Sequence, residues 1–252
     1  MIANLFAAEY KKSFRELKTY YPDQIVDIII KYFIFVAFFI GFGKDHVDIG
    51  EFYIGYLYWM VASYIIGEAS MNISFEKQVG TIEQVFLKPT PVLLILTVRT
   101  IVMLSISIMK FGILLGIVML TMGISISITP QLLLIFLVSV IGFIGIGNAL
   151  SGLTLLFAKT ASFESIISYG LLLISGTVIS YRGIPEGIFR ALRWIPMVLE
   201  IDISQKVMRT GTLSVQEFLF VLISNVAMLA LGALIFQLFL KKVKRHGIMN
   251  KY

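Results

Sequence analysis

Six long apolar runs limit what this chain can fold into. Each is long enough as a helix, at about 1.5 Å per residue, to cross a hydrocarbon core of roughly 30 Å. Only 14% of the residues are charged, whereas soluble domains carry roughly a quarter. The sequence therefore predicts an all-α membrane protein, a single domain of residues 1–252 with six transmembrane helices, at 25–43, 52–74, 91–122, 130–158, 163–181 and 217–240.

Several function classes are excluded by residues that the chain lacks. It has no cysteine, and its two histidines, His46 and His246, are far apart in the sequence, so neither a disulfide nor a metal site is expected. The sequence contains no GxxxxGK[ST] phosphate loop, so the chain is not expected to bind a nucleotide or to be an enzyme. The net charge of +6 is attributed to loops beside the membrane and not to nucleic-acid binding.

The first 22 residues predict an amphipathic helix. Apolar side chains recur at three- and four-residue spacing, and the basic residues lie largely off that stripe. Pro22 is expected to end the helix, which suits the membrane interface better than a span. The stripe consists of Ile2, Phe6, Tyr10, Phe14, Leu17 and Tyr21.

Lysine and arginine counts between the predicted spans indicate the orientation. The set of loops that includes both termini and residues 75–91 carries twelve, against six on the other side. The positive-inside rule therefore places both termini, the 241–252 tail and residues 75–91 in the cytoplasm of a multi-pass cell-membrane protein. The discordant segment is the external loop 182–216, which carries five of the six outside charges.

That external loop also carries a helical apolar pattern over residues 183–209. Ile184, Ile188, Leu192 and Ile195 recur behind Pro185. The pattern predicts short helices that dip back into the outer leaflet as a re-entrant segment before the last span. Such backbone is tolerated only against protein or a watery cavity.

Charged side chains also occur within the predicted spans. Asp27 and Lys31 are four residues apart and are expected to pair on one helix face. Glu68, Arg99 and Lys110 are intramembrane candidates for function, and an unpaired ammonium would cost ~3 kcal/mol at mid-span. No acidic residue in the other spans is an obvious partner for Lys110, so a role facing a cavity and simple snorkelling both stay open.

Small residues crowd two of the spans and predict close helix packing in preference to the lining of a substrate path. Gly112 and Gly116 form a GxxxG pattern in the third span. The fourth span has a denser set, consisting of Gly142, Gly145, Gly147, Ser151 and Gly152.

Residues 75–91, FEKQVGTIEQVFLKPTP, form a polar interval between two apolar runs. Gly80 permits a tight entry, Thr81 can cap a helix amino terminus, Glu83 complements the helix dipole and Pro89 ends the segment. By themselves these features describe any short surface helix.

The same interval resembles a known family signature. Residues 76–85, EKQVGTIEQV, followed by Pro89 and Pro91, are similar to the E-x-x-x-G-T-[LI]-E-x-[LV] then Pro pattern of ABC-2 type permeases, the membrane subunits of type V ATP-binding cassette exporters. Further along, Ser175-Gly176, Pro185, Trp194, Pro196 and Asp202 resemble the family's SG…P…P…D pattern.

The resemblance implies a permease that couples ATP hydrolysis by two separate ATPase subunits to export of an amphipathic drug, antibiotic, peptide or lipid-like molecule. ATP and Mg²⁺ would be bound by the ATPase subunits, and a second permease protomer, identical or related, would complete the pore in the lipid bilayer. It implies a coupling helix over residues 80–88, with ATPase-coupling residues Glu76, Gly80, Thr81, Ile82, Glu83, Val85 and Phe86. It also implies an external gate, with Pro185, Phe189, Trp194 and Pro196.

Three alternatives stay open. The first is a permease for a lipid-linked polysaccharide. The second is an ion-coupled secondary carrier using Glu68, Lys110 or Asp27, which predicts inverted repeats that the sequence does not show. The third is a membrane assembly subunit without transport, in which Gly80 and Glu83 would be dispensable.

Overall fold

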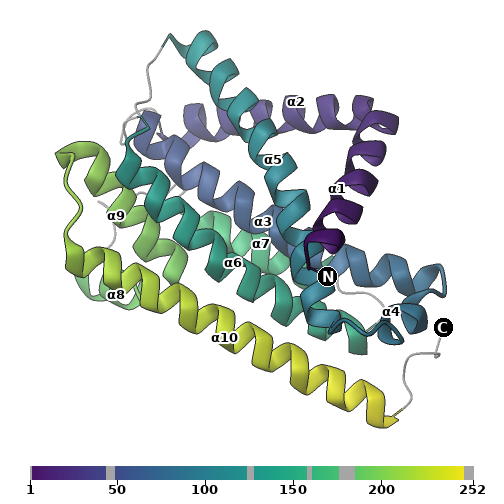
Figure 1. Cartoon of the computed structure of the whole chain (residues 1–252). Helices are drawn as coiled ribbons and strands as arrows, with labels where there is room; N and C mark the ends of the chain where they lie inside the picture. Colours follow the sequence, from purple (N-terminus) through teal and green to yellow (C-terminus); the bar gives the residue numbers. More distant parts are fainter. Residues whose placement is uncertain (1, 44–48, 124–127, 158–160, 176–184, 247–252) are drawn as a thin grey trace.

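The chain is all-helical throughout the part that the structure describes (Figure 1). The computed structural model describes residues 2–43, 49–123, 128–157, 161–175 and 185–246. The prediction of an all-α fold is confirmed. The elements are α1 (Ile2–Thr19), α2 (Tyr21–Phe38), the π-helix η1 (Phe39–Gly43), α3 (Ile49–Gln78), α4 (Ile82–Phe86), α5 (Val92–Met122), α6 (Pro130–Leu156), α7 (Ala161–Ile174), α8 (Glu186–Leu192), α9 (Pro196–Thr210) and α10 (Val215–His246).

Within the described ranges, four helices are long and apolar enough to cross a membrane: Tyr21–Gly41, α5, α6 and Val215–Arg245 of α10. They correspond to the first, third, fourth and sixth predicted spans. The predicted second span is α3, which is long but less apolar, and the fifth begins as α7, a shorter apolar helix. Residues 176–181 of that fifth span lie outside the described residues. Six spans therefore stay a prediction.

The central position of α3 explains why it is less apolar than the other long helices. It packs against α5, α6, α7 and α9, and most of its residues are buried. Two of its aromatic side chains donate hydrogen bonds to the backbone of neighbouring helices. Tyr56 donates to the carbonyl of Lys31 at 2.8 Å, and Trp59 donates to that of Ser168 at 2.9 Å. A helix shielded by other helices does not need the uniformly apolar surface that lipid contact demands.

The longest helix seam joins α6 to α10, which run side by side (Figure 1). A Cβ on Gly145 would meet the backbone of Met228 and Leu229, and one on Gly232 would meet the carbonyl of Gly145. Close packing predicted for the small residues of the fourth span is therefore confirmed. The same prediction for Gly112 and Gly116 is wrong within this chain, because nothing lies within 4 Å of a Cβ built on either residue.

The amino-terminal helix packs on protein as well as offering an apolar face. α1 ends at Thr19, and Pro22 lies in the first turn of α2, so the proline begins the second helix instead of ending the first. α1 lies against α5 and buries Glu9 and Ser13 there. Within the predicted apolar stripe, Phe14 is 66% exposed. The sequence pattern therefore identified the helix but missed its polar contact face.

Three distant parts of the sequence meet at one end of the bundle. Ile82 and Val85 of α4 share a core cluster with Phe236 and Val243 of α10, and Leu5 of α1 packs against it. Figure 1 shows the N-terminus, α4 and the end of α10 at this same end. The predicted orientation requires this arrangement, because it places both termini and residues 75–91 on one side of the membrane.

Candidate coupling site and buried charges

The polar interval forms a tight turn followed by a short helix. Gly80 has φ of 75°, in the left-handed region that a residue with a Cβ disfavours. The amide of Thr81 donates to the carbonyl of Glu76 at 2.9 Å, closing the end of α3. α4 then spans Ile82–Phe86, a shorter helix than the predicted 80–88.

Thr81 occupies the position before α4 but does not cap it as predicted. Its hydroxyl donates to the carboxylate of Glu76, and no side-chain cap bond to α4 is present. The chain reverses at Gly80, which brings this hydroxyl to the last turn of α3. Thr81 therefore fixes the turn to Glu76.

One face of α4 is an anchor and the other is open. Ile82 and Val85 are only 5% and 6% exposed, and their side chains lie in the core cluster. Phe86 is half-buried beneath the ammonium of Lys244, 5.9 Å from the ring centre. These three predicted contact residues hold the helix in place. The open face consists of Glu83, Gln84, Leu87 and Lys88.

Leu87 is a surface residue that the sequence reasoning did not single out. It is 84% exposed, directly after α4, and lies four positions from Glu83. Val79, before the turn, is 57% exposed. The position of Leu87 one helical turn beyond the polar Glu83 could have indicated that it is exposed. The interval thus presents apolar as well as charged groups outward.

Arg99 lies at the centre of a buried charge cluster behind this turn. Its Nη1 is 3.2 Å from Oε1 of Glu76, and its Nε is 3.4 Å from Oε2 of Glu9. The amide oxygen of Asn72 is 3.4 Å from the same Nη1. We call Arg99, Glu9 and Glu76 the Arg99 cluster. It connects α5, α1 and the end of α3 just before α4.

The cluster keeps Glu76 ionised. Burial acts to raise the pKa of this carboxyl, but the Thr81 hydroxyl and the Arg99 guanidinium outweigh burial and hold the pKa below its ordinary value. Beside it, the ammonium of Lys77 donates to the carbonyls of Thr154 and Leu155, both at 2.8 Å. Lys77 thereby satisfies carbonyls at the carboxyl end of α6, and burial lowers its pKa.

Lys110 has partners that the sequence analysis missed. Its ammonium donates to the amide oxygen of Gln24 at 2.6 Å and lies 3.7 Å from the carboxylate of Asp27. Asp27 also accepts from Lys31 at 2.8 Å, as predicted. The expectation that Lys110 lacks an acidic partner is therefore wrong, because the crossing of α2 and α5 brings Asp27 to it.

Glu68 is half-buried, and its backbone carbonyl accepts from Asn72.

The basic residues of the external segment are paired within its described part. Arg190 pairs with Glu186, Arg193 with Asp202, Lys206 with Glu217 and Arg209 with Glu51, at 2.6 to 3.3 Å. Arg182 lies outside the described residues. The discordant positive charge of this loop is therefore neutralised locally by acidic residues, which the Lys and Arg count ignores.

The predicted external helices are α8 and α9, and they differ in burial. Pro185 and Pro196 start them, as the proline positions suggested. α8 has no buried residue, whereas α9 packs among α3, α6 and α10. Trp194, between them, is 81% exposed and borders a cavity of about 360 Å³ against α10. Phe189 is half-buried on α8.

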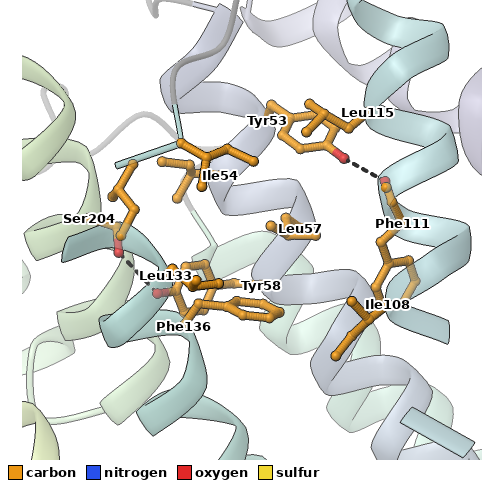
Figure 2. Close-up of a pocket in the computed structure, with 13 residues that line it drawn as sticks. Tyr53, Ile54, Leu57, Tyr58, Ile108, Phe111, Leu115, Leu133, Phe136 and Ser204 are labelled. Carbon is orange, nitrogen blue, oxygen red and sulfur yellow. Dashed lines mark hydrogen bonds between the residues drawn. The ribbon is translucent and has the colours of Figure 1, made fainter. Parts of the chain in front are cut away.

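A second cavity lies between α3, α5, α6 and α9 (Figure 2). Its volume is about 190 Å³ and its walls are almost wholly apolar. Two hydrogen bonds flank it: Tyr53 donates to the carbonyl of Phe111 at 3.2 Å, and the hydroxyls of Tyr58 and Ser204 are 3.0 Å apart. The lining includes Leu57, Ile108, Leu115, Leu133 and Phe136.

The structure also reveals a buried acid that the sequence reasoning did not single out. Glu200 on α9 is 0% exposed and accepts a hydrogen bond from the amide of Asn225 on α10 at 2.6 Å. Its position in a predicted external loop gave no signal that it would be enclosed.

Comparison with known proteins adds one match. The model of the ABC-2 type transporter family matches residues 2–209, from α1 to the last turn of α9. No curated protein matches the chain.

Proposed function

The chain belongs to the ABC-2 type transporter family and is the permease component of an ABC transporter, and we propose that α4 is its coupling helix, which receives a separate ATPase subunit. In this proposal ATP and Mg²⁺ are bound by two such ATPase subunits. Their closure would move α4 and drive an amphipathic substrate outward.

The observation that carries the proposal is the two-sided character of α4. Its inner face is fixed by Ile82 and Val85, and its outer face exposes Glu83, Gln84 and Leu87. An exposed leucine beside charged groups has the mixed apolar and polar character of a protein contact surface. A partner that pushed this face would also displace the core behind it, because Ile82 and Val85 of α4 are packed in that core.

The Arg99 cluster offers a route for that movement. Glu76 is bonded to Thr81 at the start of α4 and paired with Arg99 of α5, which is also paired with Glu9 of α1. Displacement of the turn would therefore act on two more helices at once. Packed elements with two arrangements transmit such displacements.

A second permease protomer, identical or related, completes the proposed complex. Both termini and α4 would face the cytoplasm, as the distribution of lysine and arginine predicts.

The apolar cavity beside Tyr58 supports a substrate with an apolar part (Figure 2). A drug, antibiotic, peptide or lipid-like molecule fits this description.

The test is co-purification with a phosphate-loop ATPase from the native cell, followed by reconstitution of transport. Glu83→Arg replaces the only acidic side chain of the open face by a basic one and is expected to reduce ATP-driven transport at least about tenfold, through like-charge and desolvation costs at the contact. The matched control is Glu186→Arg. It also changes an exposed first-turn glutamate of a short helix, but at the α8 end.

Equal transport by Glu83→Arg and the wild type would remove the assignment of α4. Absence of any phosphate-loop ATPase from the purified complex, with transport retained, would favour the ion-coupled carrier.

A further inference from the structure

Glu200 lies in a seam made by four helices. Its Oε1 accepts from Nδ2 of Asn225 on α10, and Asn225 is itself only 1% exposed. Tyr58 of α3, whose hydroxyl is hydrogen-bonded to Ser204 of α9 at 3.0 Å, and Ser139 of α6 line the same seam. We call Glu200, Asn225, Tyr58 and Ser139 the Glu200 cluster.

No cationic side chain balances Glu200 within the described residues. On α9 itself, Lys206 and Arg209 pair with Glu217 and Glu51, and Asp202 pairs with Arg193. The described part of α6 carries no charged residue. α3 presents the neutral Tyr58, and α10 presents Asn225. An ionised carboxylate enclosed without a cation is strongly unfavourable, so this one must bind either a proton or a cation.

Two oxygen atoms show which ligand the cluster requires. Oε2 of Glu200 and Oδ1 of Asn225 are both buried without a hydrogen-bond partner. Both are acceptors when the glutamate is ionised, and the hydroxyl of Ser139 is already donated to the carbonyl of Ile135 at 2.8 Å. Nδ2 of Asn225 already donates to Oε1 of Glu200. A proton on Oε2 would supply the donor that these two unpartnered oxygens lack.

The helices pack closely around Glu200 and Asn225. A Cβ on Gly142 of α6 would collide with Oδ1 of Asn225. The glycine therefore lets α6 pack directly against the asparagine and fixes where its amide points. A closely packed, buried arrangement of this kind suits a proton better than a hydrated metal ion.

We propose that Glu200 is a proton-binding site, and that its proton locks the external helix α9 against α6 and α10. Loss of the proton places a negative charge in the seam and loosens α9. The proposal concerns this chain alone and does not depend on the assignment of α4. Burial supports it by raising the pKa of Glu200 to about 7, against a smaller opposing effect of the Asn225 amide that is hydrogen-bonded to it.

Infrared spectroscopy of the purified permease in lipid nanodiscs tests the site directly. At pH 5 the wild type is expected to show a carbonyl band of a protonated acid that Glu200→Gln lacks and that disappears on titration above pH 7. Glu68→Gln is the control, because it removes a different, half-buried glutamate of the bundle and should leave that band in place.

The lock is tested by thermal unfolding of the wild type and Glu200→Gln. The glutamine amide of this variant would keep the hydrogen bond and stay neutral, so the variant should match the wild type at pH 5. Between pH 5 and 7 the wild type should lose about tenfold per pH unit in its folded-to-unfolded ratio relative to the variant. Pre-transition opening of α9 should rise over the same interval in the wild type alone.

Two results would overturn the proposal. One is the absence of a band specific to Glu200 at pH 5, above all if sodium then stabilises the wild type and not Glu200→Gln, since this would assign the site to a cation. The other is a constant difference in stability between the two proteins from pH 5 to 8, which would show that the proton does not lock α9.

Discussion

Near α4, a buried cation lies between two carboxylates, whereas on α9 a buried carboxylate lies among neutral groups. Arg99 is 6% exposed and is flanked by Glu9 and Glu76 from other helices. Glu200 is 0% exposed and its side chain is held by Asn225. One bundle therefore contains two different solutions to the cost of burying charge.

The difference indicates what each end can do. The Arg99 cluster joins α1, α3 and α5 through charge pairs, which in the proposed mechanism transmit movement of the α4 turn, and the lowered pKa of Glu76 keeps its carboxylate ionised near neutral pH. The Glu200 cluster depends on one exchangeable proton, so its strength changes with pH. The first arrangement suits a mechanical connection, and the second suits a seam that must open.

Removal of the central cation is expected to have the largest effect. Arg99→Met keeps an unbranched apolar stem but leaves the buried Glu9 and the half-buried Glu76 without their cation, at a cost of about 3–5 kcal/mol. The yield of folded permease and its thermal midpoint should both fall sharply. Arg190→Met is the control, because its pair with Glu186 is largely exposed and contributes little. A similar midpoint for both variants would show that the Arg99 cluster has no special structural role.

A smaller effect is expected when one carboxylate is neutralised. Glu76→Gln should cost about 1.5–3 kcal/mol at neutral pH, since it weakens charged hydrogen bonds to Arg99 and Thr81. The pKa of Glu76 is lowered in the folded state, so its contribution is present above the ordinary value of 4.5 and lost as pH falls through the folded value.

Thermal midpoints across pH therefore sharpen the comparison. The wild type should lose its advantage over Glu76→Gln as the solution is acidified. The pKa of Glu200 is raised, so the wild type should instead fall behind Glu200→Gln as pH rises towards 7. Changes of the same sign at both sites would contradict the distinction between the two clusters.

The smallest structural effect is expected from surface cysteines that place the two ends relative to the membrane. The chain has no native cysteine, and Leu87 and Trp194 are 84% and 81% exposed. An impermeant thiol reagent added outside intact cells should label Trp194→Cys and not Leu87→Cys. Val85 is unsuitable because it is buried. Labelling of Leu87→Cys from outside would reverse the predicted orientation.

Much of the fold could be predicted because hydropathy and turn chemistry act locally. Apolar runs long enough to span a membrane are visible residue by residue, and the reversal at Gly80 follows from the backbone freedom of glycine. The less apolar α3 was still identified by its length. Its central position was not, because burial by neighbouring helices leaves no simple pattern in the sequence.

The sequence by itself determined the membrane class, the helices, the polar interval at residues 75–91 and the family resemblance. The tertiary structure alone decided the partners of the buried charges. Arg99 meets Glu9, Lys110 meets Asp27 and Glu200 meets Asn225 across helices separated in the chain. Pairing depends on which helix faces cross at which depth, and the side chains that meet there lie far apart in the sequence.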